Sequence, residues 1–111
     1  MFSPGLVVIT GPMFSGKSAE LIRRLTIAKI AKLEIKVFKP AVDTRTGEEI
    51  RSREGSFLSA MTVKNAEEVL EHTQSVRVVG IDEAHFFSNG LAAVVLKLVR
   101  SGKQVIVAGL N

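Results

Sequence analysis

The chain has 111 residues, of which 46% are hydrophobic and 23% are charged, and it contains no cysteine. These values are typical of one globular domain, and the lack of thiols excludes disulfides and cysteine-ligated zinc. No apolar run reaches the roughly 18 residues of a membrane span, and the N-terminus lacks a basic segment followed by an apolar one. We therefore expect a cytoplasmic protein without zinc and without a membrane partner.

The formal net charge is +4, and much of it lies between Lys17 and Lys39, where seven Lys or Arg residues face two Glu residues. Such a run is compatible with a nucleic-acid-binding patch. No Tyr or Trp accompanies it, although bases usually stack on aromatic side chains. We interpret the run as a solvated helix face with one phosphate-binding lysine, and expect no nucleic-acid partner.

The N-terminal part of the chain carries a phosphate-binding motif between a strand and a helix. Residues 6–10 are apolar and β-branched, which predicts a strand, and the pattern that follows predicts a helix over 17–32. Between them the sequence matches G-x-x-x-x-G-K-[ST]. The matching residues are Gly11, Pro12, Met13, Phe14, Ser15, Gly16, Lys17 and Ser18.

Each part of this motif has a physical role in holding a triphosphate. Glycines let the backbone N–H groups curve around the phosphates, and the helix N-terminus adds a positive partial charge. Lys17 is predicted to reach the β- and γ-phosphates of ATP, and the Ser18 hydroxyl to ligate Mg²⁺. Met13 and Phe14 are unusual within such a loop; they either pack beneath it or contact a second substrate.

The rest of the chain alternates between strands and helices. A strand is predicted over 35–38 and ends at Pro40, because proline cannot donate to a ladder. Residues 40–60 are polar and aperiodic, so we expect them to form the mobile loop of the domain. A short helix over 66–72 follows a capping-box spacing, then a strand over 76–81, a helix from Leu91 that stops at Gly102, and a strand over 105–108.

This order predicts an α/β fold with four parallel strands, of the P-loop NTPase-like (RecA-like) type. Apolar runs such as Val-Val-Gly-Ile lack alternation, as expected of strands buried on both faces. Ligands of such sheets bind at the carboxyl ends of the strands. The phosphate motif, the loop that contains Asp43 and the pair Asp82-Glu83 all follow strands, so we expect them to converge at one edge.

The pair Asp82-Glu83 at the end of an apolar strand is a Walker B pattern when a phosphate motif precedes it. Adjacent residues at a strand end point in different directions, so we assign Asp82 to Mg²⁺ and Glu83 to the general base. Arg45 is a candidate for neutralising the transferred phosphate; a surface salt bridge with Asp43 explains it equally well.

Five blocks in order resemble the cytosolic type II thymidine kinases. They are the Gly-Pro-Met-Phe-Ser-Gly-Lys-Ser motif, Phe38-Lys39-Pro40, Asp43-Thr44-Arg45, Ser52-Arg53-Glu54-Gly55, and the stretch from Ile81 to Phe87, Ile-Asp-Glu-Ala-His-Phe-Phe. The resemblance covers nearly the whole chain, from Leu6 to Asn111.

This resemblance implies transfer of the ATP γ-phosphate to the 5′-hydroxyl of thymidine, which gives dTMP in nucleotide salvage. It further implies that Glu83 accepts the hydroxyl proton and that Asp43 and Arg45 organise phosphoryl transfer. Asp82, Glu83, Ala84 and His85 would border the ATP site, and Met13 and Phe86 would line the thymine pocket. The family usually assembles as a homotetramer.

The sequence departs from the family pattern in three respects. The position of His85 is more often Gln, and Asn111 stands where Asp is expected. The chain also ends before the lid, the thymidine-embracing loop and the cysteine-ligated zinc domain of the family, so it resembles the nucleotide-binding core alone.

Two other classes of function compete with this interpretation. Asp82-Glu83-Ala84-His85 matches the acidic box of one helicase group, which would indicate an ATP-driven nucleic-acid motor, although such motors need two domains and several hundred residues. Alternatively, the chain is a non-catalytic nucleotide-binding fragment or subunit that pairs with another polypeptide.

Overall fold

A computed structural model describes residues 3–12, 16–42, 48–87 and 89–109. The elements of this part of the chain are, in order, β1 (Gly5–Ile9), α1 (Lys17–Ile30), β2 (Ile35–Pro40), β3 (Glu49–Arg51), β4 (Phe57–Ser59), β5 (Met61–Val63), α2 (Glu67–Leu70), β6 (Val78–Ile81), the 3₁₀ turn η1 (Ala84–Phe86), α3 (Leu91–Arg100) and β7 (Gln104–Ala108).

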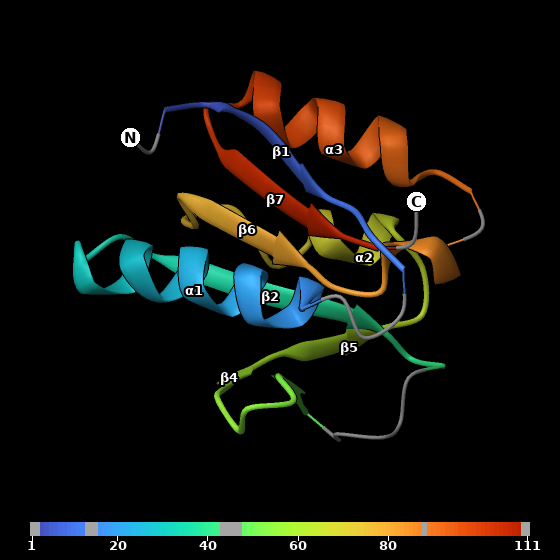
Figure 1. The fold of residues 1–111 in the computed structure, drawn as a ribbon. Coiled ribbons are helices and arrows are strands. Elements are labelled where there is room, and N and C mark those ends of the chain that lie inside the picture. Colours follow the sequence, from blue (N-terminus) through green and yellow to red (C-terminus); the bar gives the residue numbers. More distant parts are fainter. Residues whose placement is uncertain (1–2, 13–15, 43–47, 88, 110–111) are drawn as a thin grey trace.

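Five of the strands form one parallel sheet in the order β1-β7-β6-β2-β5 (Figure 1). β7 lies in the middle of the first three strands, with Val8 beside Val107 and Val79 beside Val105. All four residues of β6 are buried, as the unbroken apolar run predicted. The predicted parallel α/β fold of the P-loop NTPase-like type is therefore confirmed.

Helices cover both faces of the sheet, and the sheet separates two hydrophobic clusters, one under the helices of each face. α1 packs on one face through Leu21 and Leu25, which are fully buried. α2 and α3 pack on the other face, where Val94 and Leu98 contribute to a second cluster. Neighbouring residues of the central strands alternate between these two cores, as the pleat of a strand requires.

The segment 40–60 differs from the prediction of an irregular loop. In its described part, β3 and β4 form an antiparallel hairpin, and the block Ser52-Arg53-Glu54-Gly55 lies in its turn. The Ser52 amide donates to the Ser56 carbonyl at 2.8 Å, and Gly55 has the positive φ of 100° that such a turn needs. Whether this segment is mobile stays a prediction.

A fifth sheet strand, β5, was also missed, so the prediction of four strands was wrong. β5 pairs in parallel with β2, with Phe38 beside Met61 and Pro40 beside Val63. Parallel neighbours need a crossover, which is usually a helix; here the β3–β4 hairpin takes that place and buries Ile50 against the core of α1. Each of these strands has three residues, too few for a pattern of alternation to be read.

The predicted starts of α1 and α3 are confirmed, but α1 ends at Ile30 instead of residue 32, and α2 is shorter than the predicted helix over 66–72. The Asn65 side chain accepts a hydrogen bond from the Glu68 amide at 3.1 Å, and the Glu68 carboxylate accepts one from the Lys64 amide at 3.2 Å. α3 ends one residue before the Ser101-Gly102 turn, where Gly102 has φ 97°. Within the described residues, every helix is too short or too polar to cross a membrane.

Candidate active site

The N-terminus of α1 and the end of β1 hold the described part of the phosphate motif. Gly16 caps α1 with φ 85° and ψ 19°, a left-handed conformation that favours glycine. The Lys17 ammonium donates to the Gly11 carbonyl at 2.7 Å. This side chain therefore links the start of α1 to the first residue of the motif. Met13, Phe14 and Ser15 lie outside the described residues.

Ser18 and Asp82 meet although 64 residues separate them in the sequence. The Ser18 hydroxyl donates to Asp82 Oδ2 at 3.3 Å, and the other carboxylate oxygen accepts the Glu83 amide at 2.9 Å. Asp82 is only 6% exposed, and its own amide donates to the Phe38 carbonyl, which extends the pairing of β6 with β2 by one residue. Asp82 directly follows β6, and this extra backbone bond to β2 holds it so that its carboxylate faces Ser18 at the start of α1.

The chemistry of this pair fits a magnesium ion. Among the described residues, no group of three or more His, Asp or Glu side chains could hold a metal. Mg²⁺ does not require one, because it usually takes one or two protein oxygens and completes its shell with water and substrate phosphates. The Ser18 hydroxyl and the Asp82 carboxylate are oxygen donors of that kind.

Glu83 leaves the strand end in a different direction from Asp82. Its backbone is left-handed, with φ 51° and ψ 44°, which is uncommon for a residue other than glycine. This conformation begins η1, and the Phe86 amide donates to the Glu83 carbonyl at 3.1 Å. The Glu83 carboxylate lies 3.6 Å from the His85 ring, from Oε1 to Nε2, and the side chains are 19% and 24% exposed. Asp82 and Glu83 thus have different neighbours.

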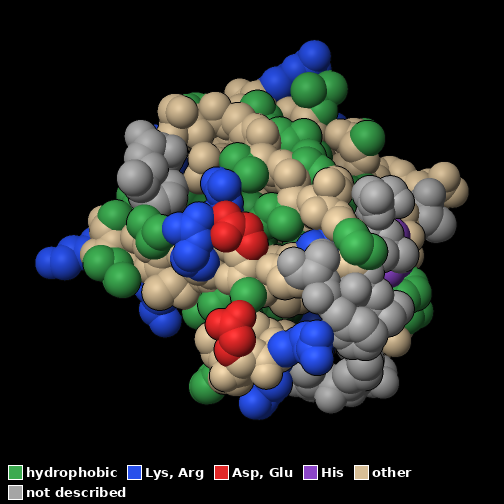
Figure 2. All heavy atoms as spheres, in the orientation of Figure 1, with side chains coloured by type: hydrophobic (Ala, Val, Ile, Leu, Met, Phe, Trp, Pro, Cys, Tyr) green, Lys and Arg blue, Asp and Glu red, His purple; other side chains and the backbone are tan. Residues whose placement is uncertain are grey.

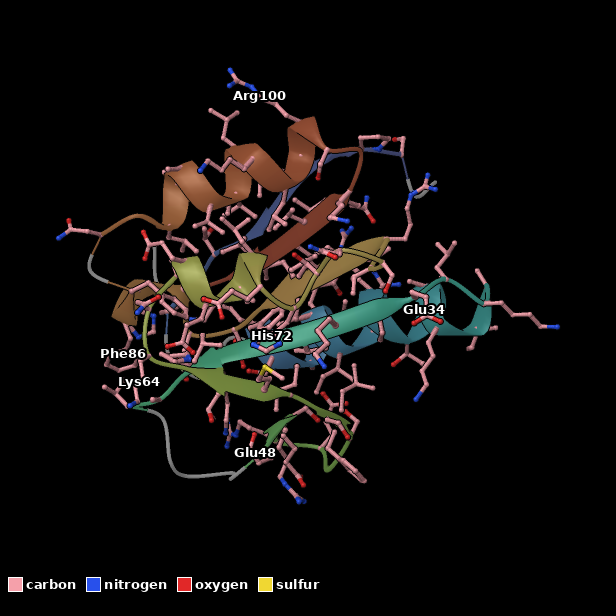
Figure 3. The ribbon with its side chains drawn as sticks, turned by 180° about the vertical axis from the view of Figure 1, so that it is seen from behind. Glu34, Glu48, Lys64, His72, Phe86 and Arg100 are labelled. Atoms are coloured by element: carbon pink, nitrogen blue, oxygen red, sulfur yellow. The ribbon has the colours of Figure 1, made fainter. Side chains whose placement is uncertain are left out.

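The remaining residues of the predicted site are only partly described. Phe86 is 52% exposed and lies at the end of the sheet where β2 and β5 finish, opposite the end that carries Glu34 (Figure 3). Asp43 and Arg45 lie outside the described residues, as does Asn111. β2, which precedes these two residues in the sequence, ends at Pro40 at the same carboxyl edge.

The structure also reveals two residues at this edge to which the sequence analysis assigned no role. Lys39 is fully buried, and its ammonium donates to the Glu49 carbonyl at 3.0 Å, which ties β2 to the start of the hairpin. Gly80 lets α1 approach β6, since a Cβ there would lie 2.6 Å from Leu25 Cδ1. The available signals were a lysine directly after an apolar strand and a glycine within one.

A separate hollow of about 560 Å³ lies between the last turn of α1, the first half of β2 and strands β4 and β5. Its lining includes Lys29, Lys36 and Glu48. None of the described residues of the phosphate motif lines it, nor does Asp82 or Glu83, so this hollow is separate from the described part of the candidate active site.

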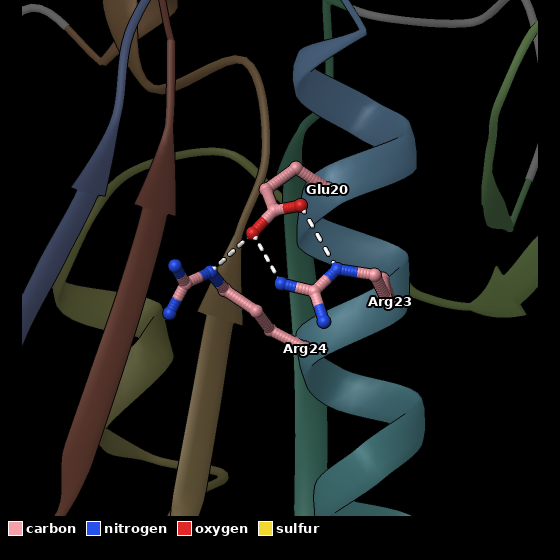
Figure 4. A network of polar contacts seen from close by, with 3 residues as sticks. All are labelled: Glu20, Arg23 and Arg24. Carbon is pink, nitrogen blue, oxygen red and sulfur yellow. Dashed lines mark hydrogen bonds and ion pairs between the residues drawn. The ribbon is translucent and has the colours of Figure 1, made fainter.

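Charge on α1 is partly neutralised within the helix. Glu20 accepts hydrogen bonds from Arg23 at 2.8 and 3.0 Å and from Arg24 at 2.7 Å (Figure 4). These two guanidinium groups lower the pKa of Glu20 from 4.5 to about 2. On the face shown in Figure 2, acidic side chains lie directly beside basic ones. The absence of a nucleic-acid partner stays a prediction.

Comparison with known proteins agrees with the resemblance inferred from the motifs. A family model described as thymidine kinase matches residues 5–111. The thymidine kinase of Bacteroides fragilis is 45% identical over 105 residues, which cover 94% of this chain and 53% of the relative. Those of Ureaplasma urealyticum and Mycoplasma genitalium are 44% and 42% identical over 110 and 106 residues, which cover 94% of this chain and 49% and 50% of the relatives.

The chain spans about half the length of the curated relatives that it matches. The matched part runs from the first residue of β1 and includes the phosphate motif, Asp82 and Glu83. The matched part therefore includes the residues that form the carboxyl edge of the sheet. This chain belongs to the thymidine kinase family.

Proposed function

We propose that this chain is the nucleotide-binding core of an ATP-dependent thymidine kinase, which transfers the γ-phosphate of ATP to the 5′-hydroxyl of thymidine and gives dTMP. The observation that carries the proposal is the contact of 3.3 Å between Ser18 and Asp82. It joins the phosphate motif to the acidic strand end in a chain of this family, and phosphoryl transfer needs both parts.

The N-terminus of α1 binds the triphosphate in this proposal. Backbone N–H groups of the motif and the helix dipole face the β- and γ-phosphates. Lys17 exchanges the Gly11 carbonyl for a phosphate oxygen, which places a positive charge where negative charge develops.

Glu83 acts as the general base. The oxygen of the thymidine 5′-hydroxyl attacks the γ-phosphorus, the bond to the bridging oxygen breaks, and ADP leaves. The hydroxyl proton passes to the Glu83 carboxylate, which is close enough to the surface for a substrate to reach, at 19% exposure. We assign Asp82 to the metal and not to the proton, because one of its oxygens accepts the Ser18 hydroxyl beside the phosphate motif and the other accepts the Glu83 amide.

Ser18 and Asp82 would hold Mg²⁺, which when bound neutralises charge on the phosphates. Asp43 and Arg45 organise the transferred group in this proposal, and Met13 and Phe86 contact the thymine base. We also propose a cytoplasmic enzyme that assembles as a homotetramer, as the resemblance implies.

Nucleoside phosphorylation by the purified 111-residue chain tests the proposal most directly. The assay supplies Mg·ATP and a panel of nucleosides, with single-stranded DNA in a parallel reaction. Thymidine-selective transfer is expected, without stimulation by DNA. DNA-stimulated ATP hydrolysis would favour the motor hypothesis instead.

Two variants separate binding from transfer. Lys17→Ala should weaken ATP binding, because a positive contact to the phosphates is lost. Glu83→Gln should abolish transfer and leave ATP affinity intact, because it removes a base but no phosphate contact. ATP binding that depends on Lys17, without transfer by the unmodified chain, would instead favour a nucleotide-binding subunit whose acceptor site lies elsewhere.

A further inference from the structure

Glu83 and His85 make a contact that regular helical geometry does not allow. In a helix, residues two apart point to different sides and do not face each other. Here Glu83 Oε1 lies 3.6 Å from His85 Nε2. The left-handed backbone of Glu83 accounts for this, because it turns the chain between the strand end and η1.

The backbone on both sides of this contact is held in place. The Glu83 amide donates to Asp82 Oδ1 at 2.9 Å, and the Glu83 carbonyl accepts the Phe86 amide at 3.1 Å. A left-handed conformation at a residue other than glycine persists only where the surroundings determine it, and such positions cluster at functional sites. These two bonds are the local part of those surroundings.

Gly109, the residue directly after β7, packs closely against η1. A Cβ on Gly109 would lie 3.2 Å from Ala84 Cβ and 3.3 Å from the His85 amide nitrogen, so only glycine fits there without movement. The Gly109 amide donates to the Ile9 carbonyl at 3.2 Å, which fixes this close approach to the β1 end. The His85 ring itself lies against Phe86, with ring centroids 4.3 Å apart and the ring planes tilted by 40°.

We propose that His85 is a positioning residue that orients the Glu83 carboxylate for proton transfer. A glutamate has several freely rotating bonds, and a base must lie within hydrogen-bond reach of the substrate proton. A ring held by η1 restricts that freedom before substrate binds, which is a form of preorganisation. A carboxylate offers about four lone-pair sites, so contact at Oε1 does not exhaust it.

This inference rests on the proposed function, since it assigns a partner to the proposed base. It differs from a role of His85 in binding ATP, which the family resemblance implies. A nucleotide contact would change the KM for ATP, whereas a positioning contact changes kcat and depends on Glu83.

The first test needs no catalysis and uses the only two histidines of the chain, His72 and His85. His72 is exposed and lies apart from Phe86, the neighbour of His85 in η1 (Figure 3). In a long-range ¹H–¹⁵N spectrum of the imidazole rings at fixed pH, Glu83→Gln should shift the ring nitrogens of His85 and leave those of His72 in place. His72→Gln assigns the two rings.

Glu54→Gln, the same change in the exposed hairpin turn, is the matched control and should shift neither ring. Backbone amide spectra of both variants check that the fold is retained. An unchanged His85 ring in folded Glu83→Gln protein would overturn the proposal. So would an equal shift in the Glu54→Gln protein.

The second test is kinetic and compares His85→Gln with His85→Leu. Leu removes the ring nitrogen that contacts Glu83 Oε1 and should lower kcat by up to ~100-fold with little change in the KM for ATP. Gln keeps a side-chain nitrogen that can make this contact and should restore most of the rate.

A raised KM for ATP with unchanged kcat in His85→Leu would overturn the positioning role in favour of a nucleotide contact. Equal damage by Gln and Leu would also overturn it. If the unmodified chain transfers no phosphate, the proposed function fails for this chain, and the imidazole spectrum alone then decides whether His85 is held against Glu83.

Discussion

The segments that follow β1 and β2 leave the same edge of the sheet, but they are built in different ways. After β1, the chain enters α1, a continuous helix of 14 residues whose apolar face is fully buried. After β2, it enters the β3–β4 hairpin, whose strands have three residues each. Both cover the same face of the sheet, since Ile50 of β3 joins the core cluster of α1.

This difference determines how firmly each segment is held. α1 contributes several fully buried side chains and starts directly at the phosphate motif, so its position is set by the core. The hairpin depends on Ile50, on the buried Lys39 ammonium and on its own turn. We expect the two segments to open with different free energies, the hairpin more readily than α1.

Removal of a buried leucine should have the largest effect and should separate the two segments. Leu25→Ala in α1 leaves a cavity against β6 and is expected to lower the free energy of unfolding by ~2–5 kcal/mol. Leu58→Ala in β4, where the side chain is only partly buried, should have less than half that effect. Urea denaturation measures both; equal losses would contradict the ranking of the segments.

Loss of the buried ammonium should loosen the hairpin and spare α1. Lys39→Met removes the bond to the Glu49 carbonyl and should destabilise by ~1–3 kcal/mol, because a part-buried acceptor loses its charged donor. Hydrogen exchange should accelerate at the Ala60 and Ser52 amides, which bond within the hairpin segment, and less at the Leu25 amide. Lys36→Met, on the same strand, is the matched control; similar acceleration there would argue against a specific anchor.

Neutralising Glu20 should have the smallest effect, with a defined dependence on pH. The pKa of Glu20 falls from 4.5 to about 2 in the folded chain, so its stabilisation is present above pH 4.5 and is lost as the pH falls towards 2. Because the pair is exposed, Glu20→Gln should reduce stability at neutral pH by less than ~1 kcal/mol. Denaturation curves at neutral pH and near pH 2 check this; a difference that persists at the lower pH would contradict it.

Prediction succeeded where a local pattern repeats over many residues. The buried face of α1, including Leu21 and Leu25, follows from helical spacing, and the position of β6 follows from an unbroken apolar run. It failed between Pro40 and Val63, because a strand of three residues cannot display a period and because a hairpin replaced the usual crossover helix. Met61 pairs with Phe38, which lies 23 positions earlier in the chain, and no pattern in the residues around Met61 identifies that partner.

The sequence by itself determined the phosphate motif, the acidic strand end, the parallel α/β class and the family, because each depends on residue types at fixed spacing along the chain. Only the tertiary structure decided that Ser18 meets Asp82, that Lys39 is buried against Glu49, and that Glu83 turns towards His85. These contacts depend on strand order and on a left-handed backbone. Both arise when distant segments pack together, and no local pattern encodes them.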